Sequence, residues 1–405
     1  MGISKESHPS SANRLEHVRD GGLKGGIMKK SLLLLCVLLT LLATSPLFAA
    51  GTKEAPKAAA APVVEENWDQ IIAAAKAEGT VVVYSTTSRI TDAAKMFEAK
   101  YGIKVESHRL SEVEVIARLS QEAAAGVVGA DLAILEDYPS MKMLLIDQGV
   151  LFNYTPPAAR EGLAPADQNP LVFAHVSRII GYNTEKYTSD PFKSIWDLTT
   201  PEWKGKVMIR DLAITGEHQN FFSEIIRRSD ELAADYQKRF GTPLVLREKN
   251  AGYEFMRRLI ENDLILRDSD TTICEAVGKK GQVDPPVGFI YVYSKHRDAV
   301  AKNLAVTYSA NVQPFGGYYY NQYIQQLKGQ KHPNASKLFT EFLMTQEGFS
   351  AWSKDLGFYS SNENLKGYEN DLPWSYWKTR LWTYEPQYAI ENRGNILDAW
   401  IKYMK

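Results

Sequence analysis

The sequence predicts an α/β fold of doubly wound, mostly parallel sheets, and two observations lead to this fold class. Short runs of β-branched and aromatic residues alternate with longer segments whose apolar residues recur at helical spacing. Several of these runs end in hydroxyl or charged residues that open the next helix. Strands and helices in regular alternation imply a parallel sheet covered by helices on both faces. Because ligands bind beyond the carboxyl ends of the strands in such sheets, the polar turns supply candidate binding residues.

The first half of the chain shows this alternation most clearly. The amphipathic segment 68–78 predicts a helix, and the apolar run 81–84, which follows Gly79, predicts a buried strand. The segment 90–101 predicts a helix that ends at Gly102, because its apolar residues fall at helical spacing. The remaining elements of this half are expected to be strands at 103–108 and 131–135 and helices at 112–125 and 141–148.

The second half repeats the order of strand, polar turn and helix. Strands are expected at 176–183, 207–209 and 264–267, and 287–293 is an apolar, aromatic run. Helices are expected at 253–262, at 335–344 and after the polar turns 215–218 and 268–272. Residues 368–403 are unusually rich in aromatic side chains, which predicts helices packed against the first half. The chain after the N-terminal segment is long enough for two domains of ordinary size.

Charge, cysteine content and missing motifs argue against several classes of function. Residues 51–405 contain 41 Lys and Arg residues against 45 Asp and Glu residues, a net charge of −4. That balance offers no general attraction to nucleic acid or to an anionic membrane. Cys274 is the only cysteine in this range, so we expect neither an intrachain disulfide nor a cysteine-based metal cluster. The sequence contains no GxSxG, HExxH or GxxxxGK segment, which argues against an enzyme of the corresponding classes.

The N-terminal residues predict export. Lys29 and Lys30 precede an almost wholly apolar run at 32–42, and small residues follow at 49–51, as in a secretory signal peptide cleaved near Ala50. We therefore expect 1–27 to be an upstream artefact, 28–50 to be the signal peptide and 51–66 to be a flexible tether.

The turn after the first predicted strand is the strongest candidate for a binding element. It consists of Ser85, Thr86, Thr87, Ser88 and Arg89. Hydroxyl groups, free backbone N–H groups and the positive end of the following helix suit an anion such as phosphate or carboxylate. The arginine can add a bidentate charged contact. The same residues also allow a purely structural interpretation, in which the hydroxyls cap the helix and the arginine pairs with a nearby carboxylate.

Two longer segments resemble the extracellular solute-binding proteins of bacterial ABC importers. They are SIWDLTTPEWKGKVMIRD at 194–211 and NASKLFTEFLMTQEGFSAWSKDLGFYSSN at 334–362. The likeness points to the group that contains ferric-iron-binding and hexose-phosphate-binding proteins. It implies a type II periplasmic-binding-protein fold, in which two lobes joined by a hinge close around a solute. Residues 67–178 and 310–405 would then form lobe 1, and residues 179–309 would form lobe 2.

The resemblance leaves the ligand open between ferric iron and an organophosphate. Iron-binding members commonly have a histidine at the end of the first strand, a glutamate after an ADxxxxE segment and an adjacent tyrosine pair. Here a hydroxyl residue takes the first position, Glu136 matches the second, and Val292 separates Tyr291 from Tyr293. Ferric iron prefers anionic oxygen ligands, so these departures weaken the iron interpretation.

The sequence thus predicts a solute-binding protein that captures a small anionic solute, with a sugar phosphate or similar organophosphate as the best match. The hydroxyl turn of lobe 1 would hold the anion, and polar side chains of lobe 2 would accept hydrogen bonds from a polyol. The candidate ligand-binding residues are Ser85, Thr86, Thr87, Ser88, Arg89, Glu136, Asp137, Asp211, Thr215, Glu217, His218, Asp268, Ser269, Asp270 and Tyr291. Many of these residue types have a structural alternative, as a helix cap or a buried hydrogen bond.

Two alternative functions remain at this point, a ferric-iron-binding protein of an iron importer and a ligand sensor for a membrane receptor kinase. The expected partners are an ABC permease and its ATPase, without nucleic acid. We expect a periplasmic monomer that is not an enzyme and that uses neither a cofactor nor a metal.

Overall fold

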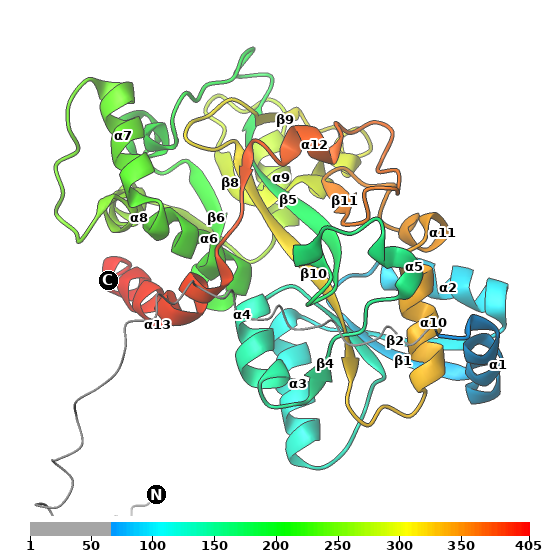
Figure 1. Cartoon of the computed structure of the whole chain (residues 1–405). Coiled ribbons are helices and arrows are strands. Elements are labelled where there is room, and N and C mark those ends of the chain that lie inside the picture. Colours follow the sequence, from blue (N-terminus) through cyan, green and yellow to red (C-terminus); the bar gives the residue numbers. More distant parts are fainter. Residues whose placement is uncertain (1–65) are drawn as a thin grey trace, which may run out of the picture. The chain divides into compact units, whose positions relative to one another are not determined.

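A computed structural model describes residues 66–405 (Figure 1). The predicted upstream segment (1–27), the signal peptide (28–50) and all but the last residue of the tether (51–66) lie outside the described residues. None of the helices described for residues 66–405 combines the length and apolar character that a membrane span needs.

The first part of the sheet is parallel, as predicted. Strand β1 (Thr80–Ser85) lies between β2 (Lys104–Arg109) and β3 (Leu132–Leu135) and runs parallel to both. The helices of this part are α1 (Trp68–Glu78), α2 (Ile90–Tyr101) and α3 (Glu112–Ala124). Gly79 and Gly102 end α1 and α2 in the left-handed conformation, with φ of 74° and 70°, as their sequence positions predict.

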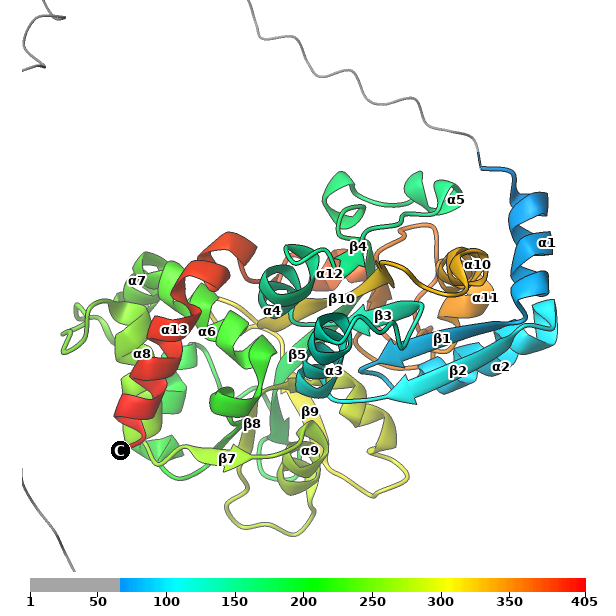
Figure 2. The same cartoon turned by 90° about the horizontal axis from the view of Figure 1, so that it is seen from below.

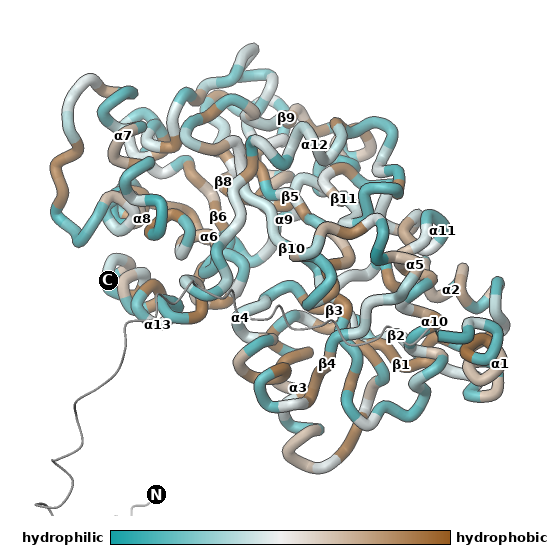
Figure 3. The backbone as a smooth tube through the Cα atoms, viewed as in Figure 1, coloured by the Kyte–Doolittle hydropathy of each residue, from teal (hydrophilic) through white to brown (hydrophobic). Residues whose placement is uncertain are grey.

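Side chains of β1 alternate between two cores, which is the basis of the doubly wound arrangement. Val81 and Val83 pack in one hydrophobic cluster with residues of α1, α2 and α10 (Pro333–Leu343). Tyr84 points to the opposite face, into a cluster with residues of α3. Because successive side chains of a strand point to opposite faces, a fully apolar strand needs helices on both sides. Figure 3 shows hydrophobic stretches in the part that holds β1 and β3.

Two long strands, β5 (Val172–Asn183) and β10 (Gly317–Leu327), connect this part to a second parallel part. They pair antiparallel with each other, and β10 also pairs antiparallel with β3. The strand order is β2-β1-β3-β10-β5-β8-β6-β7, so hydrogen bonds continue from one parallel part to the other. The sheet is therefore mixed, with two parallel parts joined by two long antiparallel strands.

The second part repeats the architecture of the first. Strand β6 (Val207–Arg210) lies parallel to β7 (Ile265–Arg267) and β8 (Val287–Val292). Helices α6 (Gly216–Arg227) and α8 (Ala251–Glu261) contribute to the core on one face, and α9 (Asp270–Gly278) covers the other. The sequence predicted β6, β7 and the helices that follow the two polar turns, whereas it marked the residues of β8 only as an apolar, aromatic run.

Shorter elements complete the described chain. They are α4 (Tyr138–Met141), η1 (Lys142–Ile146), β4 (Leu151–Phe152), α5 (Pro157–Arg160), η2 (Pro165–Asp167), η3 (Ile195–Thr199), η4 (Pro201–Trp203), η5 (Leu212–Ile214), α7 (Ser229–Phe240), η6 (Tyr293–Asp298), β9 (Val306–Ser309), α11 (Gln346–Phe349), β11 (Phe358–Ser360), α12 (Trp374–Trp377) and β12 (Leu381–Trp382). The helix predicted at 141–148 is α4 followed by the π-helical turn η1.

The C-terminal helix α13 (Pro386–Tyr403) lies on the second parallel part rather than only on the first. It packs against α6 and α8 and also contacts α4 (Figures 1 and 2). Trp400 of α13 is buried and contacts Phe222 of α6, with ring centroids 5.7 Å apart. Helix α10 packs against α1 instead. The expectation that the aromatic tail (368–403) packs against the first half therefore holds for α13 only in its contact with α4.

Candidate functional site

A cleft of about 880 Å³ lies at the carboxyl ends of strands from both parallel parts. Thr86 follows β1, Arg109 ends β2 and Glu136 follows β3, and these residues belong to the first wall of the cleft. Arg210 ends β6 and belongs to the second wall. The position agrees with the general rule that open parallel sheets bind ligands beyond the carboxyl ends of their strands.

The first wall is organised by two glutamates. Glu112, in the first turn of α3, accepts hydrogen bonds from the backbone N–H groups of Glu136 and Asp137 at 3.0–3.2 Å. Oε1 of Glu136 accepts a hydrogen bond from Thr86 Oγ1 at 3.0 Å and another from Gln322 Nε2 at 2.8 Å. These bonds hold the carboxylates of Glu112 and Glu136 in place at one end of the sheet.

The second wall is formed by η5 and the N-terminus of α6. Asp211 caps η5 by accepting from the backbone N–H of Ala213 at 2.9 Å. Thr215 then precedes Gly216, the first residue of α6. Thr215 is 4% exposed and lines the cleft, and its Oγ1 has no hydrogen-bond partner among the described residues. A first helical turn also has N–H groups without an intrahelical acceptor, so this end offers several donors.

Arg393, from the C-terminal helix, joins the two walls. Its Nη1 and Nη2 donate to the two carboxylate oxygens of Asp137 at 2.9 and 2.6 Å. Its Nε donates to Gln219 of α6 at 2.5 Å, and Asn220 of α6 donates to Asp137 at 3.1 Å. A Cβ atom on Gly216 would lie 2.5 Å from Asp137 Oδ2, so glycine permits this close approach. Asp137 is thus a carboxylate of the first wall that lies against the N-terminus of α6.

Carboxylates outnumber arginines in the cleft lining. Burial and the neighbouring negative charges raise the pKa of two of these carboxyl groups. The charged lining residues are Arg109, Arg210, Arg393, Glu112, Glu114, Glu136, Asp137 and Glu217. Burial, reinforced by the charge of Glu136, raises the pKa of Glu217 to about 7. Burial and the neighbouring carboxylates also raise the pKa of Glu112 well above its ordinary value, against the opposing effect of the Asp137 N–H. The cleft therefore carries less negative charge near neutral pH than its composition indicates.

Five of the predicted residues line this cleft, and they come from both walls. They are Thr86, Glu136, Asp137, Thr215 and Glu217. The other ten do not line the cleft. Most of them are buried, cap helices or form hydrogen bonds and ion pairs elsewhere in the fold.

The hydroxyl turn is mostly occupied with its own hydrogen bonds. Ser85 is fully buried, and its Oγ accepts from the Thr87 N–H at 3.2 Å. Thr87 Oγ1 accepts from the Arg89 N–H at 3.2 Å. The Arg89 guanidinium forms an ion pair with Asp355 rather than pointing to the cleft lining. Ser88 lies in the same turn and, like Ser85, Thr87 and Arg89, is absent from the cleft lining.

The remaining candidates of the second half are buried or cap helices. His218 is fully buried, and its Nε2 lies 3.1 Å from the carbonyl oxygen of Ile290, so this nitrogen must carry the proton. Burial lowers the pKa of His218 well below its ordinary value, which keeps the ring neutral. Asp270 forms ion pairs with Arg178 at 2.9 Å and with Arg210 at 3.6 Å.

The last three candidates also have partners within the fold. Ser269 caps α9 by accepting from the Thr272 N–H at 3.1 Å, and Asp268 accepts from the Thr272 hydroxyl at 3.4 Å. The Tyr291 hydroxyl lies 2.6 Å from His296 Nε2 in the core. Burial raises the pKa of Tyr291 well above its ordinary value, which opposes formation of a tyrosinate.

Sequence reasoning missed several residues of the cleft. Arg109 and Arg210 end predicted strands, so the strand-end rule that selected Glu136 could have found them. Glu112 opens a predicted helix, where a carboxylate is an ordinary first-turn residue and gives no signal of a site. Arg393 lies in the C-terminal helix, and no local pattern places that helix beside the cleft.

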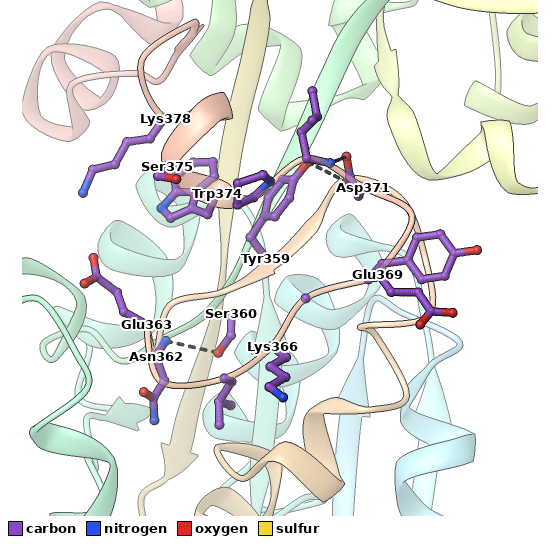
Figure 4. A pocket seen from close by; sticks show the side chains of 15 residues that line it. Tyr359, Ser360, Asn362, Glu363, Lys366, Glu369, Asp371, Trp374, Ser375 and Lys378 are labelled. Atoms are coloured by element: carbon purple, nitrogen blue, oxygen red, sulfur yellow. Dashed lines mark hydrogen bonds between the residues drawn. The ribbon is translucent and has the colours of Figure 1, made fainter.

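A second cavity, of about 660 Å³, is lined by residues 359–378 and shares no lining residue with the cleft (Figure 4). Two of its polar side chains, those of Asp371 and Tyr359, are hydrogen-bonded within the fold. Asp371 accepts from the Gly357 N–H and from the Tyr359 hydroxyl at 2.7 and 2.8 Å. Trp374 is stacked between His175 and Tyr359, with ring centroids 4.6 and 5.2 Å away. The inter-wall cleft, with its unpartnered donors, is the better candidate.

A family model described as bacterial extracellular solute-binding protein matches residues 92–377. The chain belongs to this family. Its members are binding proteins rather than enzymes, and membership implies a small solute as ligand, an ABC permease with its ATPase as partner, and a periplasmic location. A search of curated protein sequences found no match.

Solved structures of periplasmic binding proteins share the fold of this solute-binding protein. Iron-bound HitA from Pseudomonas aeruginosa is 17% identical, with a TM-score of 0.64 over 80% of this chain and 99% of that chain. AfuA from Actinobacillus pleuropneumoniae, with fructose-6-phosphate bound, is 19% identical, with a TM-score of 0.62 over 80% of this chain and 98% of that chain. The ferric binding protein from Campylobacter jejuni is 18% identical, with a TM-score of 0.59 over 80% of this chain and 99% of that chain. These likenesses confirm the predicted type II fold.

Proposed function

We propose that this protein is the solute-binding component of an ABC import system and that its solute is a small organic anion, a sugar phosphate or similar organophosphate. The observation that carries the proposal is the set of unpartnered donors at the N-terminus of α6. Thr215 Oγ1 and Arg210 Nε are buried atoms without a hydrogen-bond partner among the described residues, and both residues line the cleft. Buried donors without partners are rare, and a bound ligand is one way to satisfy them.

The N-terminus of α6 supplies the rest of the anion site. The N–H groups of Gly216 and Glu217 belong to the first helical turn and have no acceptor within the helix. The helix dipole adds positive potential at the same end. The protein itself already holds a carboxylate there, because Asp137 lies against Gly216. A phosphate beside Thr215 and Arg210 would use the donors that Asp137 leaves free.

The charge of the cleft is compatible with an anion only if some carboxylates are neutral. Arg393 is paired with Asp137. The raised pKa values of Glu217 and Glu112 favour their protonated forms, which removes repulsion next to the anion site. A protonated Glu217 can also donate a hydrogen bond to a phosphate oxygen.

The first wall suits the hydroxyl groups of the solute. Glu136 is a carboxylate acceptor that lines the cleft. The sequence assigned the anion to the hydroxyl turn and the polyol to the opposite lobe. The proposed arrangement reverses these roles, because Thr86 is the residue of the hydroxyl turn that lines the cleft, and its hydroxyl group already donates to Glu136. In the proposed arrangement, residues 67–178 and 310–405 form lobe 1 and residues 179–309 form lobe 2, except that α13 packs against α6 and α8 of lobe 2.

The test is a thermal-shift screen of residues 51–405 with sugar phosphates, phosphoglycerates, other organic anions, and ferric iron with and without citrate. A ligand that binds only the native state raises the melting temperature by mass action. We expect phosphorylated compounds to raise it and iron to leave it unchanged. A rise with iron and a tyrosinate-to-iron absorption band, without a response to phosphates, would instead support the iron-importer alternative.

A further inference from the structure

The cleft has an apolar region that neither a phosphate nor a polyol explains. Val113, Leu144 and Ile214 line it and are 66%, 48% and 62% exposed. Thirteen large hydrophobic residues are exposed in the part of the chain that the structure describes, and three of them meet in this one cleft. Single exposed apolar residues are ordinary, but apolar residues that gather in a ligand groove indicate what the groove binds.

These three residues come from both walls. Val113 lies on the side of α3 that also presents Ala117 to the cleft, whereas Val115 and Leu119 of the same helix are buried in the core. Leu144 belongs to η1, which packs against α3. Ile214 ends η5 on the opposite wall, directly before the α6 N-terminus. Figure 2 shows α3 and α4 next to each other, and α6 next to α13.

The apolar region is continuous with the proposed anion site. Ile214 is the chain neighbour of Thr215, whose hydroxyl group is one of the unpartnered donors. A solute whose anionic group lies beside Thr215 therefore extends past Ile214 toward Val113 and Leu144. The cleft volume of about 880 Å³ is near the upper end of the ordinary range for small-molecule sites, so it has room for an extension of the solute.

We infer, on the basis of the proposed function, that the solute is an amphiphilic organophosphate. The proposed class of organophosphates is thereby narrowed, and a wholly polar sugar phosphate is excluded. Its phosphate contacts Arg210 and the N-terminus of α6, and an alkyl or aryl group of about four or more carbons contacts Val113, Leu144 and Ile214. Each methylene group that leaves water in such a contact raises the affinity about fourfold. The apolar region should therefore give amphiphilic phosphates a higher affinity than wholly polar phosphates.

The experiment is a calorimetric titration of residues 51–405 with inorganic phosphate, methyl phosphate, hexyl phosphate, glucose 6-phosphate and, as an uncharged probe, hexanol. We expect hexyl phosphate to bind at least tenfold more tightly than methyl phosphate and than glucose 6-phosphate, and hexanol to bind much more weakly. The double variant Val113→Ser with Ile214→Ser should bring hexyl phosphate to within about threefold of methyl phosphate. It should leave the affinity for inorganic phosphate unchanged.

The matched control is Val300→Ser, because Val300 is 93% exposed and does not line the cleft. This variant should retain the preference for hexyl phosphate. Equal affinity for methyl and hexyl phosphate, or a preference for hexyl phosphate that survives in the double variant, overturns the inference while the proposed anion site stands. Failure of every phosphate, inorganic phosphate included, overturns the proposed function and the inference with it.

Discussion

Two turns of this protein each contain hydroxyl residues and open a helix, but they differ in their hydrogen bonds. The side chains of one turn are hydrogen-bonded within the fold, whereas a buried hydroxyl group of the other has no partner among the described residues. The turn at 85–89 follows β1 and opens α2, and the turn at 215–217 follows β6 and η5 and opens α6. In the first turn, Ser85 and Thr87 accept from backbone N–H groups of the turn itself, and Arg89 is paired with Asp355. In the second turn, Thr215 Oγ1 is buried and unpartnered among the described residues.

The comparison teaches that a hydroxyl-rich sequence does not by itself make a ligand site. Four hydroxyl residues in a row can satisfy one another and the backbone, which makes the turn rigid and leaves few donors for a solute. A single threonine and a glycine at the start of a helix can leave more donors free. The following predictions test whether the second turn binds the anion and the first turn stabilises the fold.

The largest effect is expected for Arg210→Ala. Hydrogen bonds to charged groups are worth about 1.5–3 kcal/mol, so removal of the guanidinium should weaken binding of a phosphorylated ligand roughly 10- to 100-fold in a calorimetric titration. Arg178 remains 2.9 Å from Asp270, so this carboxylate keeps an ion-pair partner. The control is Arg89→Ala, which should change the affinity by less than threefold. A loss in Arg89→Ala as large as in Arg210→Ala would reverse the roles of the two turns.

Arg89→Ala should instead lower stability. The side chain of Asp355 is only 3% exposed, and it loses one of two arginine partners, because Arg297 remains at 3.3 Å. We expect the free energy of unfolding in urea to fall by about 2 kcal/mol. The control is Lys95→Ala, an exposed position of the adjacent helix α2, which should change stability by less than about 0.5 kcal/mol. Equal stability of the two variants would show that the ion pair contributes nothing.

Thr215→Val and Thr87→Val form a matched pair with opposite expected results. Thr215→Val removes an unpartnered buried hydroxyl, so it should leave stability unchanged or raise it, and it should weaken phosphate binding about tenfold. Thr87→Val removes the acceptor of the Arg89 N–H, so it should cost about 1 kcal/mol of stability and leave the affinity unchanged. Calorimetry and urea unfolding together measure both quantities. If both variants lost affinity to the same extent, or both lost stability to the same extent, the two turns would not have the different roles assigned to them.

The smallest effect concerns the pH dependence of stability. The folded-state pKa of Glu217 is about 7, above its ordinary value of 4.5, so the folded protein binds more protons than the unfolded chain between these two values. The contribution of Glu217 to the free energy of unfolding should therefore fall as pH rises from 4.5 to 7. Glu217→Gln removes this contribution, so its advantage over the wild type should grow across that window in urea unfolding curves. A constant difference between pH 5 and 8 would rule out the raised pKa.

Much of the fold follows from local patterns. Val81, Val83 and Tyr84 predicted a strand buried on both faces, and the structure packs them in two different cores. Gly79 and Gly102 predicted the helix ends. Parallel strands place their carboxyl ends at one edge, so the same reasoning placed Thr86 and Glu136 at one crevice. In the structure they are hydrogen-bonded at 3.0 Å.

The sequence by itself determined the alternation of strands and helices, the family resemblance and the edge of the sheet where the cleft lies, because these depend on residue spacing along the chain. The tertiary structure decided which polar groups remain free. Arg89 meets Asp355 from 266 residues away, and Arg393 meets Asp137 from 256 residues away. A donor in a turn is available to a solute only when no distant carboxylate reaches it, and that depends on the packing of the whole chain.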